Sequence, residues 1–209
     1  MKAGGTFGSY RLGSDACGDW FVTALNAANP DLNMAGRLLD IGCAEFAWLE
    51  QAGACWPGME RHGIDWRKSV QSGATIQRGD VRNPDAYAPE TFDTIVSLSA
   101  IEHIGLGHYD HDPVDADGDV VAVANAVRWL KPGGWLYFDV PFSPTGYSVE
   151  GTSHRIYDAE AFRARFPLSG LTEVWRGWSP AGEPLRLLET EPTEPIYPFY
   201  VMGVWLTKS

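Results

Sequence analysis

Seven short predicted strands, several of them apolar runs, alternate along the chain with polar or amphipathic stretches. The first run begins at Arg37, carries Leu38, Leu39 and Ile41, and stops in a turn at Gly42. The other predicted strands are residues 61–65, 74–77, 92–98, 135–140, 171–178 and 200–206. The intervening patterns predict helices over residues 15–29, 45–52, 66–72, 119–130 and 158–166. Continuous apolar runs of this length are typical of strands buried on both faces of a sheet.

Strands that alternate with helices predict a doubly wound, Rossmann-like α/β fold with helices on both faces of the sheet. The last two strands are joined by a Pro- and Glu-rich loop, residues 179–198, with no clear helical pattern. They are therefore expected to pair antiparallel, so the seven-stranded sheet is mostly parallel with an antiparallel last strand. Residues 1–14, rich in Gly and Ser, are expected to form a flexible arm before a single domain over residues 15–209.

Charge and cysteine usage narrow the classes of partner. The 209 residues suit one domain, and a formal net charge of −11 argues against a nucleic-acid partner. Cys17, Cys43 and Cys55 have no metal-finger or disulfide-framework spacing, which is typical of a reducing compartment. No apolar run is long enough to span a membrane. We expect a cytoplasmic protein without nucleic-acid or membrane partners, in which the arm and the late loop can serve a homodimer contact.

The turn after the first strand is typical of a site for a nucleotide-like ligand. A buried strand, Gly42 and a following helix allow close approach of the backbone and present free N–H groups. Asp65 ends the second strand at the same edge, where its carboxylate can accept both hydroxyls of a ribose. The alternative is that Asp65 caps the next helix. Asp80 follows the third strand and is expected at the far end of the same crevice.

Five motifs follow one another along the chain: LDIGC (39–43), GID (63–65), GDV (79–81), FDTIVSLSAIEHI (92–104) and LKPGGWLYFDVP (130–141). In this order they resemble the class I S-adenosylmethionine-dependent methyltransferases. The resemblance implies S-adenosylmethionine as cofactor, with Asp40 and Gly42 beside its methionine part, Asp65 on its ribose, and Trp66 and Asp80 on its adenine. The full set of cofactor contacts that it implies is Asp40, Gly42, Ala44, Asp65, Trp66, Asp80, Val81, Ser97 and Leu98.

The first turn departs from the D-x-G-x-G-x-G pattern of that family. Ala44 and Phe46 stand where the pattern has its second and third glycines. Ala44 is a mild change that costs backbone freedom at positive φ, whereas an inward-pointing Phe46 would clash with the amino-acid end of the cofactor. Either the turn directs Phe46 into the core, or cofactor binding is weakened. We interpret the turn as a variant of the first kind, because the other cofactor acids are present.

Residues 99–119 follow the fourth strand, where a reacting group would reach a transferable methyl group. Their EH-x-GLG-x-Y segment resembles a sparsely characterised branch of the methyltransferases. His103 is the candidate base, with Glu102 orienting it or sharing the task. Two alternatives stay open: Glu102 and His103 brace the loop, or they bind a divalent metal ion. The further metal ligands would then be His108, Asp110, His111 and Asp112.

Polar side chains after the fourth and fifth strands are candidates for binding an acceptor. They are His108, Tyr109, His154, Arg155 and Tyr157. Arg155 is suited to clamp a carboxylate or phosphate, and the alternative is that it holds its loop to an acid elsewhere. Asp117 or Asp119 is expected to cap the helix that follows.

The resemblance implies methyl transfer from S-adenosylmethionine to an oxygen, or less readily a nitrogen, of a small polar acceptor such as a sugar or secondary metabolite. The small acceptor is inferred from the acidic composition. A non-catalytic binding or regulatory protein on the same fold is the alternative that Phe46 suggests. An NAD-dependent enzyme is disfavoured, because the first turn lacks G-x-G-x-x-G.

Overall fold

The structure is a computed structural model that describes residue 24 and residues 36–44, 48–109, 112–181 and 186–209. The expected arm over residues 1–14 lies outside the described residues. So does the helix expected over residues 15–29, except for Ala24, which is helical and buried. The orientation of Phe46 is likewise outside the described part of the chain.

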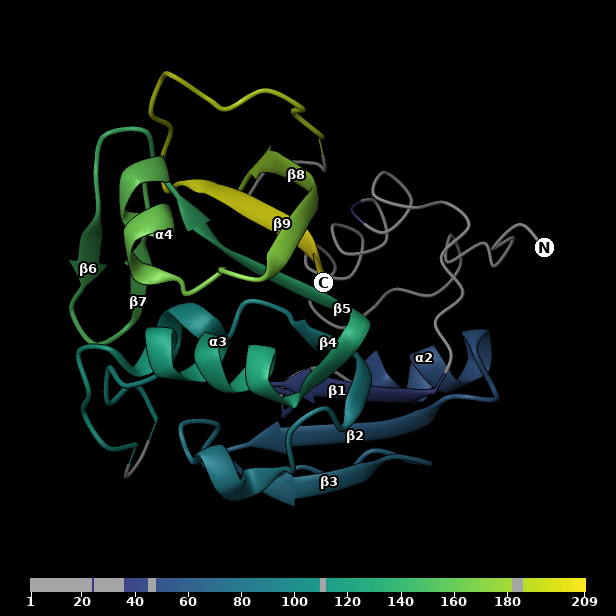
Figure 1. The fold of residues 1–209 in the computed structure, drawn as a ribbon. Helices are drawn as coiled ribbons and strands as arrows, with labels where there is room; N and C mark the ends of the chain where they lie inside the picture. Colours follow the sequence, from purple (N-terminus) through teal and green to yellow (C-terminus); the bar gives the residue numbers. More distant parts are fainter. Residues whose placement is uncertain (1–23, 25–35, 45–47, 110–111, 182–185) are drawn as a thin grey trace.

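The described residues form a seven-stranded mixed sheet with the strand order β3-β2-β1-β4-β5-β9-β8 (Figure 1). Its strands are β1 (Arg37–Ile41), β2 (Glu60–Asp65), β3 (Thr75–Arg78), β4 (Phe92–Ser97), β5 (Leu130–Phe142), β8 (Leu171–Pro180) and β9 (Tyr200–Lys208). Strands β1 to β5 pair in parallel, and β9 pairs antiparallel with both β5 and β8. The predicted sheet, mostly parallel with an antiparallel last strand, is confirmed.

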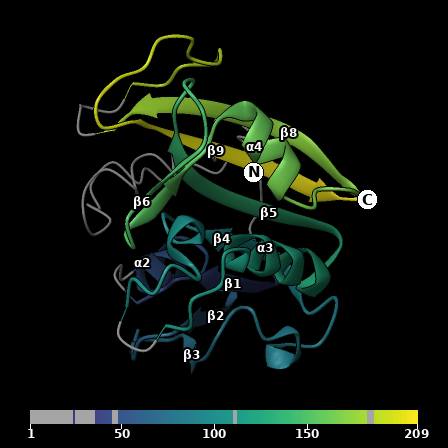
Figure 2. The ribbon, with the colours of Figure 1, turned by 90° about the vertical axis from the view of Figure 1, so that its left-hand side faces the viewer.

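Helices cover both faces of this sheet. The helical elements are α2 (Trp48–Cys55), α3 (Gly118–Trp129), α4 (Ala159–Arg165) and the 3₁₀ turns η2 (Pro84–Ala86) and η3 (Ile101–His103). Figure 2 shows α2 on one side of the sheet and α3 and α4 on the other. No helix among the described residues is long and apolar enough to cross a membrane.

Successive side chains of a strand point to opposite faces of the sheet, so each face has its own hydrophobic cluster. Leu39 of β1 packs into the cluster that holds Trp129 of α3 and Phe162 of α4. Its neighbour Leu38 packs into the opposite cluster with Trp48 of α2. Each of these side chains is essentially fully buried, and burial of one such side chain contributes about 1.5–3 kcal/mol. The sheet is therefore held between two apolar layers, as a parallel sheet requires.

Residues 66–72 form an irregular loop and not the predicted helix. The buried side chain of Gln71 accounts for this difference. Its Oε1 accepts from the backbone N of Leu49 at 3.0 Å, and its Nε2 donates to the carbonyl of Cys43 at 2.6 Å. These bonds tie the segment to the first turn and to α2, and they outweigh a weak local helix preference. Asp65 therefore caps no helix.

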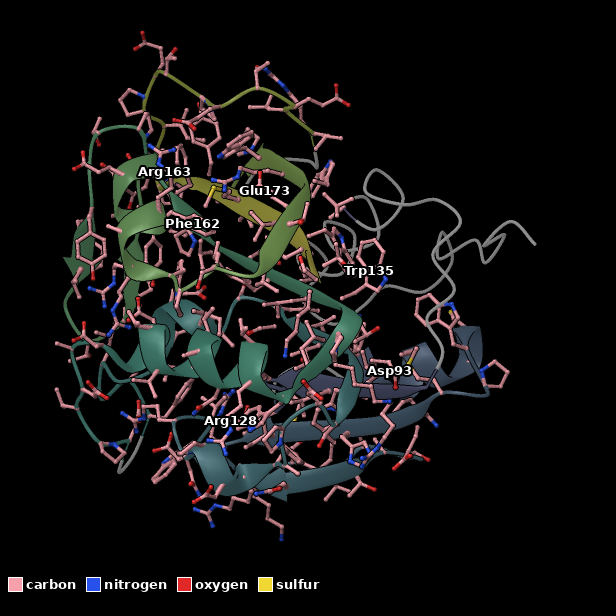
Figure 3. The ribbon with its side chains drawn as sticks, viewed as in Figure 1. Asp93, Arg128, Trp135, Phe162, Arg163 and Glu173 are labelled. Atoms are coloured by element: carbon pink, nitrogen blue, oxygen red, sulfur yellow. The ribbon has the colours of Figure 1, made fainter. Side chains whose placement is uncertain are left out.

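The LKPGG segment ends α3 as predicted, but β5 begins directly at Leu130 and not at Trp135. Phe92 pairs with Leu130, and the next pair joins Thr94 to Trp135, so the residues between them bulge out of the strand. Lys131 in this bulge donates to both carboxylate oxygens of Asp93, at 2.9 and 2.8 Å. Figure 3 shows Asp93 at the edge of the sheet opposite to the one toward which β2 and β3 point.

A small hairpin that the sequence pattern does not predict stands beside the end of β5. It consists of β6 (Ser148–Glu150) and β7 (His154–Ile156), which pair antiparallel. An isolated bridge between Phe142 and Tyr157 joins it to β5. The hairpin lies beside the loop that precedes α3 (Figure 1), and the ring of His154 in β7 stands 6.3 Å from that of His103.

Candidate cofactor and acceptor site

A pocket opens at the carboxyl ends of β1, β2 and β4, the edge toward which β2 and β3 point in Figure 1. Of the residues predicted for the site, those that line it are Gly42, Asp65, Trp66, Asp80, Val81, Leu98, His103 and Tyr109. Those outside its lining are Asp40, Ala44, Ser97, Glu102, His108, His154, Arg155 and Tyr157. Stretches far apart in sequence converge here because parallel strands end at one edge of their sheet.

Gly42 forms the turn between β1 and the pocket. Its φ of 83° lies in the left-handed region, and its N–H donates to the carbonyl of Ile64 at 2.9 Å. A Cβ atom at this position would lie 2.3 Å from the Cβ of Ala100. Glycine is therefore needed both for the backbone conformation and for the close approach of the β4–α3 loop.

Asp65 lies at the end of β2 with a nearly buried carboxylate. Its Oδ2 accepts from the backbone N of Ala44 at 2.9 Å, which ties the second strand to the first turn. Its Oδ1 accepts from the backbone N of Arg67 at 2.7 Å, and the guanidinium of Arg67 adds bonds to both oxygens. Four donors thus orient this carboxylate at the pocket wall.

Asp80, after β3, is paired with Arg82 in a similar way. The guanidinium of Arg82 contacts both carboxylate oxygens of Asp80 at 2.8–3.1 Å. Arg82 also bonds to Asp112 Oδ1 at 3.1 Å and to the carbonyl of Pro113 at 2.6 Å. Burial raises the pKa of Asp80, but the bonds from Arg82 outweigh it and leave the pKa below its usual value. Asp80 is therefore ionised at neutral pH.

Asp40 and Ser97 are buried in neighbouring strands and do not line the pocket. Ser97 donates to the carbonyl of Ile41 at 3.1 Å, which joins β4 to β1. Burial, and then the negative charge of Asp65, raises the pKa of Asp40 well above its usual value. Both residues support the first turn from within the sheet.

Ser99 and Ala100 line the pocket just beyond β4, and a buried carboxylate behind them holds the turn. Asp139 of β5 is fully buried, and its Oδ1 accepts from the backbone N and the hydroxyl of Ser99, at 2.6 and 3.2 Å. Its Oδ2 accepts from Tyr137 at 3.1 Å. These bonds stabilise Ser99 in a left-handed conformation, φ 47°, which is unusual for serine.

Asp139 makes the stability of the fold depend on pH. Burial raises its pKa to about 6, against about 4 in an unfolded chain, so the native carboxyl binds its proton more tightly. Native stability therefore falls as pH rises between these values, by about 3 kcal/mol in total. We expect Asp139→Asn to gain about this much stability relative to wild type between pH ~4 and pH ~7, measured by urea unfolding. A difference between the two proteins that is constant with pH would contradict the assignment.

His103, at the end of η3, has one ring nitrogen engaged by the hairpin. Its Nδ1 contacts the carbonyl oxygen of Ser153, and its Nε2 lies 3.7 Å from Glu102 Oε1. Since a carbonyl only accepts, Nδ1 carries the proton of the neutral ring and Nε2 is left as the basic nitrogen. The Ser153 carbonyl had no signal in the sequence that marked it for this role.

Aromatic rings from three elements gather around His103. His108 stacks on it, with ring centroids 4.9 Å apart and planes 21° from parallel. His154 of β7 stands edge-on at 6.3 Å, and Phe199 stands edge-on to His154 at 5.3 Å. Burial and the nearby His108 lower the pKa of His154, so its ring is neutral at neutral pH. The predicted candidates His103, His108, Tyr109 and His154 therefore lie close to one another.

Glu102 is buried, and it lies beside His103 as the adjacent sequence positions imply. Among the residues that the structure describes, no group of three or more His, Cys, Asp or Glu side chains is placed to hold a metal ion. Asp112 is instead paired with Arg82. Asp110 and His111 lie outside the described residues.

Arg155 and Tyr157 are buried away from the pocket and do not present polar groups to an acceptor in this structure. The guanidinium of Arg155 donates to the carbonyls of Ile104 and Ala116, at 2.8 and 3.2 Å, and its Nε lies 3.6 Å from Asp119. Tyr157 donates to Asp119 at 2.8 Å. Arg155 thus holds the β4–α3 loop, which corresponds to the alternative in which it pairs with an acid elsewhere. Neither Asp117 nor Asp119 makes the predicted cap by a side-chain bond, and Asp119 is the buried acid of this network.

Replacement of Arg155 tests this structural role. In Arg155→Met, Asp119 keeps Arg165 and Tyr157 as partners, but the buried carbonyls of Glu102 and Ile104 lose the bonds from Arg155. Leaving a buried acceptor unpaired costs about 1–3 kcal/mol, so the two together cost about 2–6 kcal/mol. We expect the free energy of unfolding to fall by that amount in urea titrations. Arg163→Met is the matched control, because Arg163 is exposed on α4 (Figure 3), and it is expected to change stability by less than about 0.5 kcal/mol. Unchanged stability with weakened acceptor binding would favour the substrate clamp.

Three residues that shape the site were not predicted from the sequence: Arg67, Asp139 and Ser153. The pairing of Arg67 with Asp65 could have been predicted, since the pattern D-x-R occurs at the end of β2 (65–67) and again after β3 (80–82). Asp139 also had a signal, as an acid within an otherwise apolar run. Ser153 acts through its backbone carbonyl, which sequence patterns do not reveal.

The sequence of the chain matches a known protein family. The family model described as "Caenorhabditis protein of unknown function, DUF268" matches residues 66–172. The chain belongs to this family. The DUF268 segment contains most of the residues that line the pocket, among them Trp66, Asp80 and His103, and it also contains the β6–β7 hairpin.

A curated relative of this DUF268 chain is ribosomal RNA large subunit methyltransferase E of Hyphomonas neptunium. The two are 36% identical over 120 residues, which cover 53% of this chain and 49% of the relative. The match thus spans about half the length of that protein.

Solved structures that share the fold include two methyltransferases with bound S-adenosylhomocysteine. One is 1,6-didemethyltoxoflavin-N1-methyltransferase of Burkholderia thailandensis, with a TM-score of 0.65, 13% identity, and coverage of 94% of this chain and 80% of that one. The other is the N-methyltransferase NodS of Bradyrhizobium japonicum, with a TM-score of 0.53, 18% identity, and coverage of 91% and 84%. The DUF268 chain therefore has the fold of the S-adenosylmethionine-dependent methyltransferases, as its motifs predicted.

Proposed function

We propose that the protein is an S-adenosylmethionine-dependent methyltransferase that acts on an oxygen, or less readily a nitrogen, of a small polar acceptor such as a sugar or secondary metabolite. The observation that carries the proposal is the convergence of Asp65, Asp80 and His103 on one pocket at the carboxyl edge of the sheet. The carboxylate of Asp65 suits the hydroxyls of a ribose, and that of Asp80 suits the amino group of an adenine. The imidazole of His103 suits a proton transfer.

The residues of the pocket fit the cofactor. Asp65 would accept the ribose hydroxyls, Trp66 would pack against adenine and Asp80 would accept from its amino group. The turn at Gly42, which has no room for a side chain, would lie beside the methionine part. S-adenosylmethionine supplies an electrophilic methyl group when it is bound.

His103 is proposed to remove the proton of the acceptor. With Nδ1 directed at the Ser153 carbonyl, Nε2 is the atom that takes the proton, and Glu102 Oε1 at 3.7 Å stabilises the positive ring that forms. The stacked His108 limits the rotation of the ring. Methyl transfer is an in-line displacement at the methyl carbon, so alignment of the acceptor by these rings contributes as well.

The surroundings of His103 support a small, uncharged polar acceptor. His108, Tyr109 and His154 offer ring N–H and hydroxyl groups within a few ångströms of one another, and the pKa of His154 is lowered. Arg155, the side chain best suited to an anion, is buried elsewhere. The net charge of −11 also disfavours an RNA acceptor, although the curated relative is by name an rRNA enzyme.

The test is calorimetry with S-adenosylhomocysteine, followed by methyl transfer from labelled S-adenosylmethionine to a panel of sugars, phenols and amines, with and without Mg²⁺. Binding in the micromolar range and transfer to at least one hydroxyl acceptor are expected. Binding without transfer to any acceptor would favour the non-catalytic alternative. No binding at all would contradict the proposal.

The proposed compartment is the cytoplasm. Cys43 and Cys55 are both free thiols, which fits a reducing environment. Homodimerisation also remains a proposal, which the molecular mass in solution would test.

A further inference from the structure

The carboxylate of Asp65 is already saturated by the protein itself. Oδ1 accepts from the backbone N of Arg67 at 2.7 Å and from its Nε at 3.1 Å. Oδ2 accepts from the backbone N of Ala44 at 2.9 Å and from Arg67 Nη2 at 3.2 Å. A carboxylate offers about four lone-pair positions, so these donors use all of them.

The donors to Asp65 fall into two kinds. One backbone N–H reaches each oxygen, and these two bonds belong to the first turn and to the end of β2. The guanidinium of Arg67 supplies the second bond to each oxygen. If the guanidinium leaves, one position becomes available on each oxygen, which matches the two adjacent hydroxyls of a ribose.

The side chain of Arg67 is more exposed than that of its counterpart Arg82. Arg82 is held by Asp80, Asp112 and the carbonyl of Pro113, and its side chain is 9% exposed. The side chain of Arg67 is 28% exposed, and the face of its guanidinium lies 4.0 Å from the ring centroid of Tyr109. Its greater exposure lets the Arg67 side chain move away from Asp65 with less loss of packing than Arg82 would suffer on leaving Asp80.

We infer that Arg67 occupies the ribose position of Asp65 and is displaced when the cofactor binds. The inference rests on the proposed function. Arg67 is thus a residue that sets cofactor affinity and selectivity, because only a ligand with two adjacent hydroxyls replaces both of its bonds to Asp65. The contact with Tyr109 joins this exchange to the β4–α3 loop, which also carries His103 and His108.

The test is calorimetric titration of S-adenosylhomocysteine into wild type, Arg67→Lys and Arg67→Ala. Removal of the competing guanidinium is expected to tighten binding about tenfold in Arg67→Ala, with Arg67→Lys intermediate because one ammonium replaces only one bond. Arg128→Ala is the matched control: it removes the same charge from an exposed position on α3 (Figure 3) and is expected to bind as wild type does.

A second ligand distinguishes displacement of the Arg67 guanidinium from a general effect of removing its positive charge. S-adenosylhomocysteine that lacks the 2′-hydroxyl is expected to bind wild type much more weakly than the parent compound, and to recover part of that loss in Arg67→Ala. Weaker or unchanged binding of the parent compound by a folded Arg67→Ala protein would overturn the inference and leave the proposed function standing. Failure of both wild type and Arg67→Ala to bind would instead count against the proposed function.

Discussion

Asp65→Ala is expected to weaken S-adenosylhomocysteine binding at least about a hundredfold. Hydrogen bonds to a charged group contribute about 1.5–3 kcal/mol each, and the loss of two therefore exceeds the ~2.7 kcal/mol that a hundredfold change represents. The bond that Asp65 makes to Ala44 is lost as well, so the first turn loses its link to β2. Isothermal calorimetry at one pH measures the effect directly.

Two further variants make this result specific to the carboxylate. Asp85→Ala removes an exposed acid in η2, which does not line the pocket, and should bind as wild type does. Asp65→Asn retains the size and one acceptor oxygen, and its affinity should fall between those of wild type and Asp65→Ala. Equal affinities for wild type and Asp65→Ala would mean that the ribose lies elsewhere, and the assignment of the pocket would have to be abandoned.

His103→Gln is expected to lower kcat by about 10²–10⁴, the usual contribution of a general base, while S-adenosylhomocysteine affinity changes little. The reason is geometric: His103 lines the pocket and Nε2 is its basic nitrogen, because Nδ1 is directed at Ser153. A base must be unprotonated to act, so the wild-type rate should fall at low pH and this fall should disappear in the variant.

The control for His103 is His62→Gln, since His62 bonds to Glu60 and Arg37 away from the pocket. It should retain kcat. The alternative in which Glu102 and His103 only brace the loop makes a different prediction: a lower free energy of unfolding in His103→Gln with kcat per folded molecule unchanged. Measuring stability and kcat on the same preparation therefore separates the two roles. Loss of a Mg²⁺-dependent rate in the variant would instead support metal binding.

Some elements followed from local patterns, and others were reversed by distant contacts. The strands and most helices were predictable because side-chain periodicity and turn residues are local properties. The predicted helix at residues 66–72 fails because Gln71 binds backbone groups of Cys43 and Leu49, more than twenty positions away. The hairpin β6–β7 was missed because its strands are each three residues long and carry no clear alternation.

For the site, the sequence by itself determined which residues stand at the ends of strands. The four residues Gly42, Asp65, Asp80 and His103 each end or follow a predicted strand, and parallel strands bring such positions to one edge of the sheet. This is why the pocket and its main chemical groups were predictable without coordinates.

Only the tertiary structure decided what each group does once it is there. It places Arg155 in a buried network outside the pocket lining, directs Nδ1 of His103 at the Ser153 carbonyl, and pairs the Asp65 carboxylate with Arg67. Side-chain direction and hydrogen-bond partners depend on atoms from several distant segments at once, and no local pattern encodes them. The order of strands and acidic residues therefore determines which residues form the site, and the tertiary contacts determine what each of them can do.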